Sequence, residues 1–279
     1  MPVRIVTDSN CDVPADLVAR HNIVVVASVL NLAGQSYFDG VDLSRAEFYR
    51  RLPHLNPLPT TAAPSAGAFE AAYRSCGAAD IIAVHLSSTF SAIYNAARLG
   101  AEPLGDQVTL VDSLQVSMGM GWQVLAAAEV ASAGGSRAEA LAAIHSVQQS
   151  LCVLAALDTI EYLRRGGRAS LLSSVLGDML QIKPLLEVKA GQVITLARLR
   201  TRQKVREALV ARLEALGPLE RLAVLHADCL DDARALADRL APRAVQPPLV
   251  VEAAAVIGTH VGPGTIGVAA VAAARPNQP

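Results

Sequence analysis

The chain has 279 residues, of which 52% are apolar but only 4% aromatic, and its 24 basic and 25 acidic residues leave a formal net charge of −1. This length predicts two domains or one large α/β unit, and the near-neutral charge gives no electrostatic basis for binding nucleic acid or an anionic membrane. Because aromatic side chains are so few, Ala, Val and Leu must fill the interior. Such packing favours slender apolar cavities.

The N-terminus passes directly from Met1-Pro2 into a strand pattern, without the basic start and apolar core of a secretion signal. We therefore expect a cytoplasmic protein. The most apolar windows, residues 116–131 and 249–257, contain charged or amide side chains and are shorter than a membrane span, so no transmembrane segment is expected.

The cysteines are scattered without a C-x-x-C pair, which argues against a zinc site or a redox dithiol: Cys11, Cys76, Cys152 and Cys229. All four are expected to be reduced. Cys76 and Cys152 are predicted to lie in the core, whereas Cys11 follows a strand in a predicted turn and is a candidate for exposure.

The first half of the chain alternates strand and helix patterns, which is typical of a parallel sheet. Strands are predicted over residues 4–7, 23–31, 36–38, 81–85 and 108–111, and helices over 14–21, 44–52, 65–76, 91–99, 116–133 and 137–149. Residues 33–35 are expected to form a hairpin turn, and Ser65 is a good N-cap.

The second half predicts another α/β layer. Strands are expected over 151–157, 182–188, 192–199, 222–226 and 249–254, and helices over 171–178, 203–216 and 231–240. The tight turn at 188–192 predicts a hairpin, which makes this sheet mixed rather than parallel. The predicted fold class is α/β with two α/β domains, residues 1–155 and 156–279.

Residues 258–267 combine four glycines and two threonines with His260. Because Gly262, Pro263 and Gly264 favour a sharp turn, we expect the chain to turn here and to begin a helix near Thr265, whose free amides would attract an anion. His260, just upstream, would hydrogen-bond such a ligand.

Hydroxyl groups follow the predicted strand at 81–85, where ligands commonly bind in α/β sheets. Ser91 can cap the next helix and still serve a ligand, so both interpretations stay open, and Thr61 is either a turn hydroxyl or a ligand contact. Asp8-Ser9 and Asp112-Ser113 each end a strand, a position typical of side chains that satisfy turn amides.

Two arginine groups are compatible both with a solvated surface, the usual explanation of the first group, and with anion binding. One surrounds the Gly166-Gly167 bend and includes Arg168. In the other, Arg198, Arg200 and Arg202 would share one face of an extended strand.

Several function classes lack their motifs. No G-x-S-x-G elbow surrounds a serine, so a triad involving His226 and Asp228 rests only on the presence of its parts. The histidines form no metal-ligand cluster, and neither a P-loop nor a G-x-G-x-x-G fingerprint follows a strand. We therefore expect no metal, ATP or NAD site.

Six motifs in order resemble those of the DegV family from end to end. They are Asp8-Ser9 with Asp12-Val13-Pro14, Thr61 with Pro64-Ser65, Ser87-Ser88-x-x-Ser91, Val111-Asp112-Ser113, Leu157-Asp158-Thr159 with Gly166-Gly167-Arg168, and Gly258-Thr259-His260-x-Gly262-Pro263-Gly264. The resemblance implies a bacterial, non-enzymatic carrier of phospholipid metabolism that binds a long-chain fatty acid at the interface of two domains and presents it to a separate fatty acid kinase.

Carried over by position, the resemblance implies that Thr61, Ser91 and His260 hold the acyl carboxylate. Arg168, Arg200, Ser88 and Thr259 would face the head group or the kinase. The chain departs from the family pattern at Ala92 and Ile93, which stand where Gly-Thr is usual, and at Asn10-Cys11, which replaces a small hydroxylic pair.

Two other functions stay open at this point. One is a serine-dependent lipid hydrolase or acyltransferase that uses Ser91 or Ser88 with His260. The other is a regulatory or scaffold role without a ligand.

Overall fold

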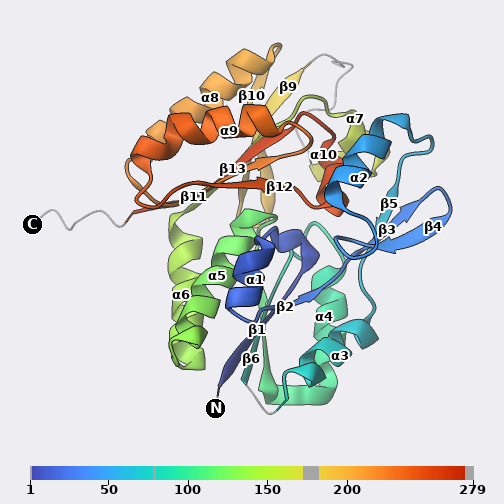
Figure 1. The fold of residues 1–279 in the computed structure, drawn as a ribbon, viewed down its shortest axis with the longest axis vertical. Helices are drawn as coiled ribbons and strands as arrows, with labels where there is room; N and C mark the ends of the chain where they lie inside the picture. Colours follow the sequence, from blue (N-terminus) through green and yellow to red (C-terminus); the bar gives the residue numbers. More distant parts are fainter. Residues whose placement is uncertain (1, 78–79, 172–181, 274–279) are drawn as a thin grey trace, which may run out of the picture.

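A computed structural model describes residues 2–77, 80–171 and 182–273, which form three β-sheets and the helices around them (Figure 1). A four-stranded parallel sheet, in the order β2-β1-β6-β7, occupies the lower half of the view. Its strands are β1 (Val3–Asp8), β2 (Val24–Val26), β6 (Asp80–His85) and β7 (Val108–Asp112). All of its pairings are parallel, so the strands end at one edge, as predicted.

Five helices accompany this sheet. They are α1 (Ala15–Arg20), α3 (Ala66–Ser75), α4 (Ile93–Ala101), α5 (Met118–Ser132) and α6 (Arg137–Ser150). Helix α5 is buried around most of its circumference because it lies between the parallel sheet and the six-stranded sheet, where the indole Nε1 of Trp122 donates to the carbonyl of Ala269 (3.0 Å). Ser65 caps α3 by accepting from the Ala68 amide, as its position predicted.

The second sheet is mixed and has the order β10-β9-β8-β13-β11-β12. Its strands are β8 (Leu151–Ala156), β9 (Lys183–Lys189), β10 (Gln192–Leu199), β11 (Leu219–His226), β12 (Leu249–Glu252) and β13 (Ile266–Ala272). The helices of this half are α7 (Glu161–Arg165), α8 (Arg202–Glu214), α9 (Leu230–Leu240) and α10 (Ala255–Val261). The predicted hairpin is present as the antiparallel β9-β10 pair.

A small third sheet, β4-β3-β5, was predicted only in part. Strands β3 (Val29–Leu32) and β4 (Gln35–Phe38) form the expected hairpin, and β5 (Thr60–Ala62) pairs with the other edge of β3. Helix α2 (Arg45–Arg51) covers this sheet with Phe48 and Tyr49, and α10 lies beside it (Figure 1). Short 3-10 turns complete the described chain: Ser9–Cys11, Leu52–His54, Glu102–Gln107, Ala169–Leu171 and Ala241–Arg243.

The prediction of a helix beginning near Thr265 is wrong. Residues up to Val261 belong to α10, and after the turn the chain enters β13. The run from Ile266 onward consists of small and β-branched apolar residues and is buried between β8 and β11, as is typical of a central strand. No helix N-terminus therefore forms an anion site here.

The glycines of this turn are explained by close contacts. A Cβ added at Gly262 (φ +75°) would lie 2.3 Å from Cδ2 of Tyr162, and one added at Gly264 (φ +78°) would lie 2.5 Å from Nη2 of Arg202. Both positions also have the positive φ that side chains rarely adopt. The glycine-rich composition thus lets α7 and α8 approach the turn.

Two further predictions, the exposure of Cys11 and the shared strand face of the arginines, are wrong. Cys11 is buried rather than exposed, because the 3-10 turn after β1 folds it against the core. Arg202 does not share a strand face with Arg198, since β10 ends at Leu199 and Arg202 begins α8. The predicted helix over 171–178 lies outside the described residues from position 172 onward.

The division into domains 1–155 and 156–279 stays a prediction. Its boundary falls inside β8, all of which pairs within the mixed sheet. One hydrophobic cluster also contains residues of both parts, for example Val84 and Val271. No helix in the described part of the chain is long and apolar enough to cross a membrane.

Candidate functional site

A largely apolar cavity of about 310 Å³ lies where the carboxyl edge of the parallel sheet meets the mixed sheet and α10. Phe90 lines it from the side of the parallel sheet, and Leu186 and Val188 line it from β9. Polar side chains contribute at five described positions of the wall: Asn10, Thr61, Ser91, Arg168 and His260. An apolar cavity with a few polar groups is the usual form of a small-molecule site.

Thr61 and His260 meet at this cavity although 198 residues separate them in the chain. Thr61 lies in β5, His260 lies in the last turn of α10, and Nε2 of His260 is 3.1 Å from Oγ1 of Thr61. Burial, assisted by the charge of Arg168, lowers the pKa of His260 from 6.5 to about 4. The imidazole is therefore neutral at neutral pH.

The surroundings of the other imidazole nitrogen, Nδ1, indicate which group donates the hydrogen in the contact between His260 and Thr61. Nδ1 of His260 is buried against the backbone of Gly166 and has no hydrogen-bond partner among the described residues. A proton on Nδ1 would be a buried donor without an acceptor, so the tautomer protonated at Nε2 is favoured. That tautomer donates to Thr61 and leaves the threonine hydroxyl hydrogen for a ligand.

Ser91 lies in the loop between β6 and α4. Its Oγ accepts from the amide of Ile93 (3.3 Å), the first residue of α4. A hydroxyl that accepts one bond still has a hydrogen to donate. Both interpretations of Ser91, as a local cap and as a ligand contact, are therefore compatible with this geometry.

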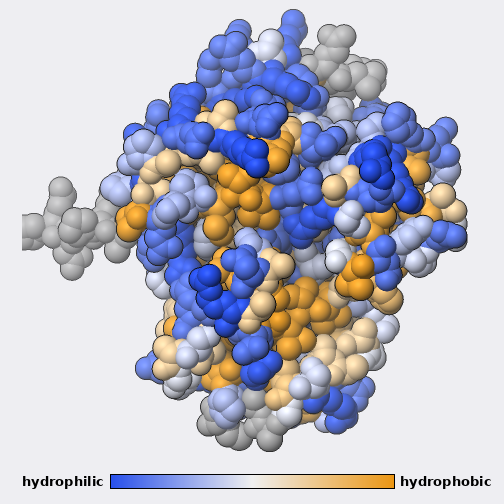
Figure 2. All heavy atoms as spheres, viewed as in Figure 1, coloured by the Kyte–Doolittle hydropathy of each residue, from blue (hydrophilic) through white to orange (hydrophobic). Residues whose placement is uncertain are grey.

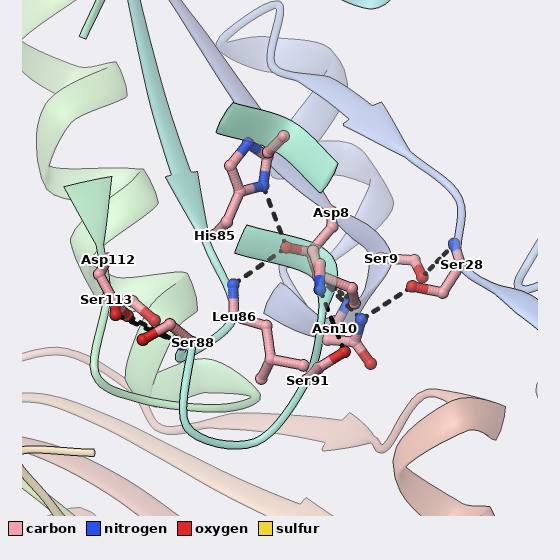
Figure 3. Close-up of polar contacts among 12 residues, drawn as sticks. Asp8, Ser9, Asn10, Ser28, His85, Leu86, Ser88, Ser91, Asp112 and Ser113 are labelled. Carbon is pink, nitrogen blue, oxygen red and sulfur yellow. Dashed lines mark hydrogen bonds and ion pairs between the residues drawn. The ribbon is translucent and has the colours of Figure 1, made fainter. Parts of the chain in front are cut away.

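A buried polar network supports the wall behind these residues (Figure 3). The carboxylate of Asp8, fully buried at the end of β1, accepts from the Asn10 and Leu86 amides and lies 3.1 Å from Nδ1 of His85. Asp112 similarly accepts from the Ser88 and Leu114 amides. The prediction that these aspartates satisfy turn amides is confirmed.

Two further carboxylates fix the start of α10. Asp12 accepts from the Ala254 amide (2.9 Å), and Asp39 accepts from the Ala255 amide (3.2 Å). Burial raises the pKa of Asp12 to about 6, although Arg45 lies 3.0 Å away and opposes this shift. Because α10 carries His260, this clamp sets the position of the imidazole.

The seven predicted site residues differ in their positions: four line the cavity, two are exposed and one is buried within α10. Thr61, Ser91, His260 and Arg168 line the cavity, whereas Ser88 and Arg200 are exposed and are not among its described lining residues. The hydroxyl of Thr259 is buried and donates to the carbonyl of Ala255 (2.9 Å) inside α10. The expected role of Thr259 at the head group or the kinase stays a prediction, and its hydroxyl already has a partner inside the helix.

Sequence reasoning missed Asn10 as a lining residue and Asp12 and Asp39 as the clamp of α10. Asn10 follows Asp8 at the carboxyl edge of the parallel sheet, and this position was the available signal. The partners of Asp12 and Asp39 lie more than 200 residues away, so no local pattern indicates them.

The arrangement does not favour nucleophilic catalysis. His260 contacts Thr61, and no described hydrogen bond joins it to Ser88 or Ser91. A serine nucleophile needs such a contact with its general base. The described residues also contain no group of three or more His, Cys, Asp or Glu side chains that could hold a metal ion.

A second hollow of about 480 Å³ lies on another part of the surface and shares no described lining residue with the first cavity. Val24 and Arg45 are among its lining residues. Apolar side chains gather near β2 on the face shown in Figure 2. Val25 and Val41, which line the hollow, are exposed. This hollow is open to solvent and contributes none of the residues predicted for the site.

Comparisons with known proteins agree with the architecture. The family model of the uncharacterised DegV family matches residues 2–273. A DegV domain-containing protein of Streptomyces coelicolor is 36% identical, with 95% of this chain and 97% of the relative covered.

Two similar solved structures carry titles that state fatty acid binding. A DegV family protein from Thermus thermophilus has a TM-score of 0.90 and 32% identity, with 98% of this chain and all of that chain covered. DegV from Bacillus subtilis has a TM-score of 0.87 and 26% identity, with 97% and 99% covered. By its sequence from residue 2 to residue 273, this chain belongs to the DegV family.

Proposed function

We propose that this chain binds one long-chain fatty acid, with the head group at Thr61, Ser91 and His260 and the tail along the apolar wall of the cavity. The single observation that carries the proposal is the cavity itself, whose described wall is apolar except at five positions. The solved relatives described as fatty acid-binding proteins support the same ligand class.

The chemistry of the wall suits an amphiphile that enters tail first. Neutral hydrogen bonds to the head contribute about 1 to 3 kcal/mol for a pair, whereas each buried methylene contributes about 0.8 kcal/mol. The tail therefore sets most of the affinity. The hydroxyls of Thr61 and Ser91 fix the depth and orientation of the head.

We further propose that the chain is a carrier and makes no bonds itself. A separate fatty acid kinase would phosphorylate the head group held at the mouth of the cavity. Arg168, on the wall, would serve the phosphorylated head, and the exposed Arg200 and Ser88 would face the kinase. Arginine suits this role because its guanidinium binds phosphate oxygens in a bidentate manner.

Replacing both head-group hydroxyls tests these roles. In the double variant Thr61→Val and Ser91→Ala, we expect affinity for a saturated fatty acid to fall by about five- to 150-fold, the equivalent of about 1 to 3 kcal/mol, while the tail contacts remain. Phosphorylation of the bound acid by an added fatty acid kinase should fall further, since the head is no longer held in register. Binding is measured by fluorescence displacement, and acyl phosphate by mass spectrometry.

The matched control is Thr60→Val. Thr60 is the neighbour of Thr61 in β5, is exposed and points to the opposite face of the strand. It should leave both binding and phosphorylation unchanged. If the double variant supports phosphorylation as well as the wild type does, Thr61 and Ser91 do not position the head.

A further inference from the structure

The amide side chain of Asn10 presents a buried oxygen without a donor. Its Nδ2 donates to the carboxylate of Asp8 (2.8 Å) and to Oγ of Ser28 (2.9 Å), as Figure 3 shows. The Oδ1 atom has no hydrogen-bond partner among the described residues, and the residue is fully buried. Because a carboxylate only accepts hydrogen bonds, the amide nitrogen of Asn10 must face Asp8. The amide oxygen therefore points away from that carboxylate.

Asn10 is one of the polar residues that line the cavity, together with the proposed head-group residues Ser91 and Thr61. Its partner Ser28 immediately precedes β3, and the register of β3 with β5 places Leu30 opposite Thr61. Asn10 therefore lines the same cavity as the two hydroxyl donors, at a position that sequence patterns did not identify.

We infer that Asn10 is a fourth head-group residue, whose amide oxygen accepts a hydrogen bond from the ligand, and that the fatty acid is therefore held as the neutral carboxylic acid. The inference rests on the proposed fatty acid binding. A carboxylate carries only acceptors and would be repelled by this oxygen, whereas a neutral carboxyl group donates its O–H to Asn10 and accepts from Thr61 or Ser91 through its carbonyl.

Taken together, the charged and titratable groups around the head favour a neutral carboxyl group over a carboxylate. His260 of α10 is neutral at neutral pH, and the Asp8 carboxylate of β1, directly behind Asn10, disfavours a second negative charge. Arg168, after α7, is the opposing group. One of its guanidinium nitrogens donates to the carbonyl of Gly166 (2.9 Å), and its side chain is partly exposed, so solvent weakens its effect.

The first test uses the wild-type protein loaded with a saturated fatty acid that carries ¹³C at the carboxyl carbon. Carbon NMR across a pH series should show the bound carboxyl titrating at least about one pH unit above an ordinary exposed carboxyl, whose pKa is about 4.3. A bound carboxyl that titrates at or below the ordinary value overturns the inference. A protein that takes up no fatty acid overturns the proposed function as well, so the two failures are distinguishable.

A variant then assigns the effect to Asn10. Asn10→Ser keeps a hydroxyl donor for Asp8 but withdraws the amide oxygen, and it should lower the pKa of the bound carboxyl by about one unit or more. Asn95→Ser, on the exposed side of α4, is the matched control and should leave it unchanged. A raised pKa that persists in Asn10→Ser contradicts the role of Asn10.

A ligand series gives the same information without any variant. A fatty primary amide is uncharged and carries a donor, so it should bind the wild type within about threefold of the acid. The methyl ester of the same chain lacks the donor and should bind at least about tenfold more weakly than the amide. Equal binding of amide and ester would overturn the inference even if Asn10→Ser failed to fold.

Discussion

Ala155→Phe is expected to weaken fatty acid binding by at least about a hundredfold. Ala155 lies in β8, between Gly267 and Leu186 on the neighbouring strands, and its side chain lines the cavity. A ring at this position would displace about four methylenes of the tail, each worth about 0.8 kcal/mol, or about 3 kcal/mol in total. Affinity is measured by fluorescence displacement of a bound fatty acid probe.

The size of this effect follows from the balance between tail and head. A saturated tail of about fifteen buried carbons contributes about 12 kcal/mol of gross transfer free energy, before the cost of association is subtracted. The hydrogen bonds of the head contribute much less. Displacing about four methylenes, at about 3 kcal/mol, should therefore weaken binding at least as much as the double variant at Thr61 and Ser91, at about 1 to 3 kcal/mol.

The matched control for this prediction is Ala71→Phe. Ala71 is an exposed residue of α3 that does not line the cavity, so the same change in side chain should leave affinity unaltered. Thermal unfolding of both variants separates a blocked cavity from a damaged fold. If folded Ala155→Phe binds as tightly as the wild type, the tail does not occupy this cavity.

The ligand-free protein is expected to lose about 2 kcal/mol of folding free energy through His260 between pH 7 and pH 5. The pKa of His260 is about 4 in the folded protein and 6.5 as its ordinary value. Between these values the unfolded chain binds a proton that the folded chain does not, so stability falls as pH falls. The free energy of unfolding is measured in urea at both pH values.

The variant His260→Gln should remove this part of the pH dependence. His145→Gln, at an exposed position of α6, is the control and should retain it. An unchanged slope in His260→Gln would contradict a neutral, buried imidazole. It would also remove the argument that Nε2 donates to Thr61.

The α/β layers were predictable because their patterns are local. In the first half, the strands and helices are each marked by a hydrophobic pattern that spans only a few residues. In the second half, the turn at residues 188–192 indicated the antiparallel hairpin of the mixed sheet. Strand β5 was missed, because Thr60-Thr61-Ala62 is short and polar and becomes a strand only by pairing with β3.

The turn after α10 shows why the glycine-rich motif was misread. Its glycines indicated close backbone approach correctly, but the partners in that approach, Tyr162 and Arg202, are remote in sequence. The buried pairing of β13 with β8 and β11 then decided the structure after the turn. Local patterns suggested a helix start, and tertiary pairing produced a strand.

The candidate site was predictable to the extent that its residues belong to recurring motifs. Thr61, Ser91, His260 and Arg168 were singled out separately, and the structure brings them to one cavity. Burial distinguishes two further residues: the hydroxyl of Thr259 donates to the backbone of α10, whereas Asn10 lines the cavity. Sequence spacing carries little information about burial at positions beside a turn.

Native mass spectrometry of the protein purified under mild conditions tests the central claim most directly. We expect a one-to-one complex with a fatty acid of about fourteen to eighteen carbons, the length assumed for the tail. That complex should be lost on delipidation and restored by added acid. A protein that purifies without lipid and takes up no added fatty acid would contradict the proposed fatty acid binding.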